Sequence, residues 1–111
     1  MATDKKETAG IIEAEDKNSV VLKKSLDTKE GKIEKITFDF EKITGRDLLN
    51  IEKTARSMGD NTPSITFSMT YQALIAARAT GLKYDDILDL KGFDFTSVLG
   101  MVNGFLFTGD L

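Results

Sequence analysis

The sequence predicts an α+β fold, in which an N-terminal β-hairpin packs on three to four C-terminal α-helices and a disordered tail precedes the hairpin. Two patterns lead to this prediction. Between residues 19 and 41, apolar and polar residues alternate as in a strand with one buried face. Beyond residue 44, apolar residues recur every three or four positions, as on one face of a helix. A chain of 111 residues is long enough for one domain, which we assign to residues 19–111.

Residues 1–18 are expected to form the disordered tail. They are mostly polar and of mixed charge, and Ile11 and Ile12 form their one aliphatic pair. So little apolar surface does not offset the conformational entropy that is lost when a segment becomes ordered.

The hairpin is expected between about Ser19 and Glu41. Its first strand begins with an apolar β-branched run, Val20-Val21-Leu22, and its second strand places three apolar side chains on one face: Ile36, Phe38 and Phe40. Residues 27–31 have the composition of a turn, in which Gly31 is free to adopt a positive φ. Ile33 has the wrong parity for the buried face, so we expect a bulge or a longer loop between Ile33 and Ile36.

The first helix is expected to begin near Thr44, because Thr44 and Asp47 form a capping box with Asp in place of the usual Glu. Its apolar positions follow at helical spacing: Leu48, Ile51, Ala55 and Met58. Gly59 fits the left-handed position that ends a helix. Residues 60–64, which include Pro63, are expected to form a loop.

Three further helical segments follow. The alanine-rich segment from about Thr66 to Thr80 predicts a helix with Phe67 on its apolar side and Gly81 at its end. A short acidic helix is expected over residues 84–90, with three side chains directed inward: Ile87, Leu88 and Leu90. Asp94 or Thr96 is expected to cap the last helix, whose apolar stripe consists of Phe95, Val98, Leu99, Val102, Phe105 and Leu106.

The composition removes several classes of function. A net charge of −3 gives no electrostatic footprint for nucleic acid. The chain has no Cys, which excludes disulfides and thiolate metal sites, and no His, which removes the commonest general base. No apolar run approaches the roughly 18 residues that span a membrane. The first residues lack the apolar core of a secretory signal, so we expect a soluble intracellular protein.

One acidic cluster offers a possible chemistry. Asp85, Asp86 and Asp89 lie close together in the sequence, and grouped carboxylates serve acid–base or divalent-metal chemistry. The spacing lacks the Gly and the final Glu of a calcium loop. Acidic residues are also favoured near the N-terminus of any helix by the helix dipole. A small carboxylate-dependent hydrolase therefore stands as a distant alternative to a binding protein.

The last 19 residues carry a surplus of large apolar side chains, with four of the seven phenylalanines of the chain: Phe93, Phe95, Phe105 and Phe107. Such a surplus serves either the core or a groove for a partner. We take six residues of this segment as candidates for partner binding: Met101, Phe105, Leu106, Phe107, Gly100 and Gly104. Each glycine costs a helix roughly 1 kcal/mol relative to Ala. That cost fits close approach by a partner helix or a second copy, and it equally fits fraying near the chain end.

The order of these segments resembles the tail assembly chaperones of long-tailed phages, above all the small proteins of contractile-tailed temperate phages. The matching pieces run through residues 19–107: Val20-Val21-Leu22-Lys23-Lys24, Gly31 through Ile36-Thr37-Phe38, Gly45-Arg46-Asp47-Leu48-Leu49, Thr80-Gly81-Leu82, Leu90 through Asp94-Phe95, and Val98, Val102 and Phe105-Leu106. The chain departs from the pattern in its tail before Ser19 and in the loop from Asp60 to Pro63.

The resemblance implies a protein without catalytic activity or cofactor that acts in the cytoplasm of the host. Such chaperones bind the long, helical tape measure protein, keep it soluble and help to bring in subunits of the tail tube. A structural tail or neck subunit that is retained in the virion is the second reading. We therefore expect the tape measure protein as partner, together with the tail tube protein or a second copy of the chain.

Overall fold

The computed structural model describes residues 18–108 and shows the α+β architecture that the sequence predicts. The elements are β1 (Ser19–Thr28), β2 (Gly31–Thr37), the 3-10 turn η1 (Phe40–Lys42), α2 (Gly45–Ser57), the 3-10 turn η2 (Ile65–Phe67), α3 (Met69–Thr80), α4 (Tyr84–Leu88) and α5 (Gly92–Phe107). The predicted tail lies outside the described residues except for Asn18. The carbonyl oxygen of Asn18 accepts a hydrogen bond of 2.8 Å from the amide of Phe38, so Asn18 belongs with the hairpin.

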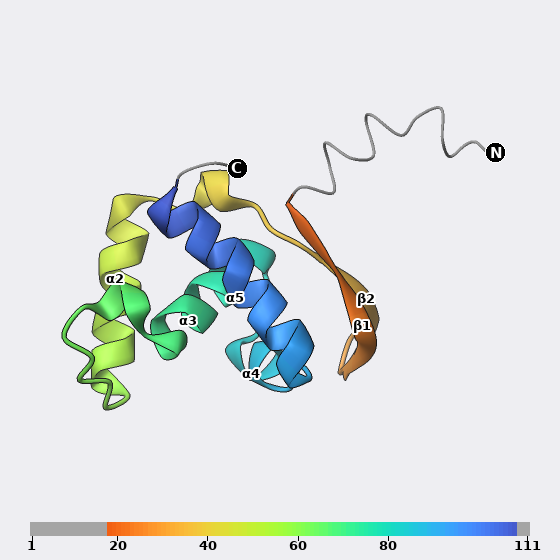
Figure 1. The fold of residues 1–111 in the computed structure, drawn as a ribbon. Coiled ribbons are helices and arrows are strands. Elements are labelled where there is room, and N and C mark those ends of the chain that lie inside the picture. Colours follow the sequence, from red (N-terminus) through yellow and green to blue (C-terminus); the bar gives the residue numbers. More distant parts are fainter. Residues whose placement is uncertain (1–17, 109–111) are drawn as a thin grey trace.

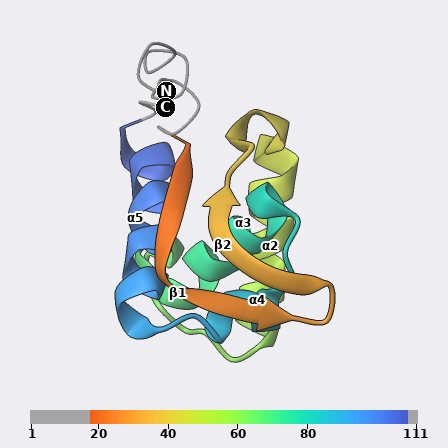
Figure 2. The ribbon, with the colours of Figure 1, turned by 90° about the vertical axis from the view of Figure 1, so that its right-hand side faces the viewer.

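Helix α3 lies at the centre of the helical part and contacts α2, α4 and α5 (Figure 1). The hairpin of β1 and β2 lies on one side of the helices, and β1 also packs against α5 (Figure 2). Its two strands are antiparallel, and the turn between them is followed by Gly31 with a φ of 123°. Only glycine adopts this φ without strain, as the sequence predicts.

The second strand is shorter than predicted. Ile36, Phe38 and Phe40 are all buried, which confirms the predicted face, but the strand ends at Thr37 and Phe40 opens η1. The chain leaves β1 here because the amide of Asp39 donates to the carbonyl oxygen of Ala79 at the end of α3, at 2.9 Å. A helix end therefore replaces the neighbouring strand as the hydrogen-bond partner.

The irregularity predicted between Ile33 and Ile36 is confirmed, and the extra residues that produce it belong to the paired strand β1. Val21 pairs with Lys35 and Leu26 pairs with Ile33. Four residues of β1 therefore lie between these pairs, against one residue of β2. The extra residues leave backbone amides of β1 without partners in the ladder.

The side chain of Asp94 supplies hydrogen-bond acceptors for two of these amides. Its two carboxylate oxygens accept hydrogen bonds from the amides of Lys23 and Lys24, at 2.9 and 3.0 Å. Asp94 is only 1% exposed. The prediction that Asp94 or Thr96 caps the last helix is wrong, because α5 begins at Gly92 and Asp94 lies inside its first turn. Its carboxylate instead accepts hydrogen bonds from the bulged segment of β1.

The predicted helix signals are otherwise largely confirmed. Thr44 and Asp47 form the capping box of α2, and Gly59 and Gly81 have the positive φ values of helix ends, 98° and 81°. Helix α3 begins later than predicted, because the hydroxyl of Ser68 accepts a hydrogen bond from the amide of Tyr71 and caps the helix there.

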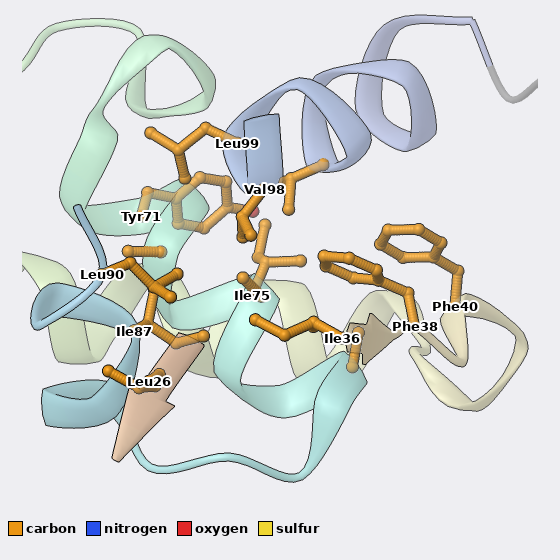
Figure 3. Packing of buried hydrophobic residues seen from close by; sticks show 14 of the residues in the cluster. Leu26, Ile36, Phe38, Phe40, Tyr71, Ile75, Ile87, Leu90, Val98 and Leu99 are labelled. Carbon is orange, nitrogen blue, oxygen red and sulfur yellow. The ribbon is translucent and has the colours of Figure 1, made fainter. Parts of the chain in front are cut away.

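The core forms where α3, α5, α4 and the hairpin meet, and Figure 3 shows Ile75 of α3 among residues of these elements. The predicted stripe of α5 faces this core, with Val98, Leu99 and Val102 buried and its other members partly buried. Leu88 was expected inside but is 46% exposed on the outer side of α4. At one edge Phe40 stacks between Phe38 and Phe105, with ring centroids 5.2 and 4.7 Å away.

Candidate functional site

Two exposed phenylalanines from distant parts of the chain stack on each other. Phe67 ends η2, and Phe107 is the last residue of α5. Their ring centroids are 5.4 Å apart, and their planes differ by 20°. Phe67 is 69% exposed and Phe107 is 49% exposed, so the pair leaves much aromatic surface in water. Large aromatic side chains in this position are typical of binding surfaces.

A hollow of about 420 Å³ lies beside this pair. Its lining consists of Met58, Gly59, Asp60, Thr62, Phe67, Ser68, Met69 and Thr70. Met58 at the end of α2 and Met69 at the start of α3 are 50% and 63% exposed. We call these lining residues together with Phe107 the Phe67 hollow. Three of the exposed large hydrophobic side chains line this one depression: Met58, Phe67 and Met69.

A hydrogen-bond network holds the loop that forms the hollow. The carboxylate of Asp60 accepts hydrogen bonds from the amide of Thr62, at 2.9 Å, and from the hydroxyl of Ser68. The guanidinium of Arg56 donates to the carbonyl oxygens of Asp60 and Thr62, at 3.2 and 2.6 Å. The hydrogen bond from Ser68 is the main reason why the pKa of Asp60 is lowered to about 2. Asp60 is therefore ionised at neutral pH and fixes the loop.

A second network links the residue before Phe67 to α3 and α5. The amide nitrogen of Gln72, a buried residue of α3, donates to the carbonyl oxygen of Thr66 at 2.7 Å. The side chains of Gln72 and Asn103 exchange hydrogen bonds of 3.3 Å between α3 and α5. Thr66 precedes Phe67, and Asn103 lies about one helical turn before Phe107. These bonds therefore hold both ends of the aromatic stack.

Of the six residues proposed from the sequence for partner binding, only Phe107 contacts a residue that lines the depression, since its ring stacks on that of Phe67. Three others are partly buried and pack against the core: Met101, Phe105 and Leu106. Gly100 and Gly104 lie elsewhere on α5, and a Cβ added to either would have no neighbour within 4 Å. Within the described chain nothing approaches these glycines closely.

Sequence reasoning missed Met58, Phe67 and Met69 as parts of a surface. Phe67 was assigned to the apolar side of a helix, which requires α3 to begin near Thr66. Ser68 carried the missing signal, since serine is a favoured N-cap residue and a cap at this position leaves Phe67 outside the helix.

The acidic cluster lies around another hollow, of about 390 Å³. Asp85, Asp86 and Asp89 share it with the end of β1, the hairpin turn and the residue before α4: Asp27, Thr28, Lys29, Glu30 and Lys83. Two lysines thus stand among the carboxylates. Across residues 18–108, no three acidic side chains are grouped closely enough to hold a metal ion.

None of the described helices combines the length and the apolar character that crossing a membrane requires. Comparisons with models of protein families, with curated proteins and with solved structures find no match to this chain.

Proposed function

We propose that this chain is a tail assembly chaperone of a long, contractile-tailed temperate phage. In the host cytoplasm it binds the tape measure protein, keeps it soluble and promotes assembly of the tail tube around it. The proposal rests on the resemblance of residues 19–107 to that family and on one structural observation. That observation is the exposed stack of Phe67 on Phe107 beside a hollow lined with methionine.

The reasoning from this surface to binding is physical. Apolar side chains that are half exposed or more carry a free-energy cost in water, which is recovered when a partner covers them. In the Phe67 hollow the exposed apolar side chains come from α2, η2, α3 and α5. A surface assembled from four elements and held by hydrogen bonds is suited to recognition, since little order has to be gained on binding.

A helical partner fits this surface. Amphipathic helices present apolar side chains at positions i, i+3, i+4 and i+7, and these dock into apolar grooves. The tape measure protein of such phages is a long, helix-rich chain, so it carries many such faces. When the chaperone covers an apolar face of the tape measure protein, that face is not available to other apolar faces. In this way the proposed chaperone keeps the tape measure protein soluble.

Co-purification with a fragment of the tape measure protein tests the proposal. The double variant Phe67→Ser/Phe107→Ser should lose binding, because it removes both rings of the stack. Phe93→Ser is the matched control, since Phe93 lies on α5 and is 52% exposed but lies outside the Phe67 hollow. Circular dichroism of all three proteins establishes that they are folded. Absence of binding by the folded wild-type chain would contradict the proposal.

A further inference from the structure

We infer that the Phe67 hollow takes a short, uncharged apolar stretch of about two helical turns, within an otherwise polar helix, and that it releases this stretch readily. The inference rests on the proposed function, and it names the part of the partner that is recognised. Three properties of the hollow carry it: its area, its charge and its side chains.

The area of the hollow fits a short segment better than a second copy of the chain. Four large apolar side chains are exposed in it to between 49% and 69%: Met58, Phe67, Met69 and Phe107. With about 200 Å² for each side chain, they offer roughly 400–500 Å². A stable complex buries about 800 Å² on each partner. Two turns of a helix, about 11 Å long, match the smaller area.

The charge of the lining indicates that the contacting stretch is uncharged. Asp60 is the one ionisable residue of the lining, and both of its carboxylate oxygens are already bonded, one to Thr62 and one to Ser68. The other polar residues of the lining are neutral. An acidic side chain placed here would lose water and face the like charge of Asp60, and a basic one would find only Asp60, a carboxylate that Thr62 and Ser68 already engage. We therefore expect the charged side chains of the partner to lie outside the two helical turns that contact the hollow.

The hollow combines flexible methionine side chains with a loop backbone that hydrogen bonds hold in place. Met58 and Met69 have unbranched, polarisable side chains that adjust to partners of different shape. Arg56 donates to the carbonyl oxygens of Asp60 and Thr62 and so fixes the loop that follows Met58. Such a surface selects apolar helical faces as a class and not a single sequence.

Binding of a synthetic peptide, followed through the methionine methyl groups, tests this inference. The probe is a 14-residue helical peptide with leucines at i, i+3, i+4 and i+7 and Lys and Glu elsewhere. A control peptide has the same composition, but its leucines do not share a face. The chain has four methionines, so labelling the methyl groups with carbon-13 reports on Met58 and Met69 in the hollow and on Met101 away from it.

The expected result is a gradual shift of the Met58 and Met69 signals in fast exchange, with Met101 unchanged. Phe67→Ser/Phe107→Ser should raise Kd at least tenfold, while Phe93→Ser leaves it within twofold. Equal binding of the control peptide, a main shift at Met101, or slow exchange would overturn the inference. Shifts of Met58 and Met69 on concentrating the protein alone would also overturn it, in favour of a second copy.

The proposed function and the inference about the bound segment can be contradicted independently of each other. If the peptide binds in the hollow and the tape measure fragment does not co-purify, the proposed function falls and the inference stands. If the fragment co-purifies equally with the double variant and the peptide leaves Met58 and Met69 unshifted, the inference falls and the proposed function stands with another surface.

Discussion

Replacing Asp94 should weaken the attachment of the hairpin to α5, because one carboxylate bonds two consecutive amides of the β1 bulge. Asp94→Ala removes both acceptors and leaves the amides of Lys23 and Lys24 without a protein partner. Hydrogen bonds to a charged group contribute about 1.5–3 kcal/mol each. Lys23 and Lys24 are exposed residues, so water reaches part of this region and the lower value applies.

Two bonds at the lower value give a loss of about 3 kcal/mol. A domain of this size has a total stability of roughly 5–14 kcal/mol. At about 4–8 °C per kcal/mol, Tm should fall by roughly 12–24 °C. Asp94→Asn keeps one acceptor oxygen but turns its NH2 group toward the other amide, so we expect a loss close to that of Asp94→Ala.

Urea denaturation followed by circular dichroism measures this change, and hydrogen exchange at the amides of Lys23 and Lys24 locates it. Thr96→Ala is the matched control on the same helix. Thr96 is exposed and its hydroxyl bonds only the carbonyl oxygen of Phe93, so a change below about 0.5 kcal/mol is expected. A loss below about 1 kcal/mol for Asp94→Ala, with both amides still protected, would refute this account of the bulge.

Three further predictions concern the core, the loop and the helix ends. Phe38→Asp should unfold the domain, since it buries an unpaired charge at a site that is 3% exposed; circular dichroism at 25 °C checks this. The pKa of Asp60 is lowered to about 2 in the folded chain, so its contribution to stability is present above the unfolded pKa of about 3.9 and is lost as the pH falls through about 2. The fall in unfolding free energy between these pH values should therefore be smaller for Asp60→Asn, as urea titrations will measure. Gly81→Ala should destabilise the fold by about 1 kcal/mol, because its φ is 81°, whereas Gly100→Ala, in a helix with open space around it, should stabilise it by about as much. Equal effects of both changes on Tm would contradict this assignment.

Local patterns predicted much of this fold. The alternation of Ile36, Phe38 and Phe40 correctly indicated the buried face of the hairpin, and the capping box at Thr44 correctly placed the start of α2. Both patterns depend on neighbours in the sequence. The spacing of apolar residues indicates the type of the element that contains them, and a capping residue indicates where a helix begins. Both signals hold whichever other element packs against it.

The errors arise where distant segments meet. Asp94 looked like a helix cap, but its partners lie 70 and 71 positions away in β1. Phe40 continued the alternation of a strand, but the end of α3 draws the chain out of the ladder one residue earlier, at Asp39. The Phe67 hollow likewise depends on a stack between positions 67 and 107. Periodicity carries no information about such pairs.

The solubility of the tape measure protein, with and without the chain, decides whether the chain acts as its chaperone. The protein is expressed alone, with the wild-type chain, with Phe67→Ser/Phe107→Ser and with Phe93→Ser, and its soluble fraction is measured after centrifugation. We expect the wild-type chain and Phe93→Ser to raise the soluble fraction to the same extent, and the double variant to leave it near the level found without the chain. Equal solubility with the folded double variant would contradict the role of the Phe67 hollow, and no increase with the wild-type chain would contradict the chaperone itself.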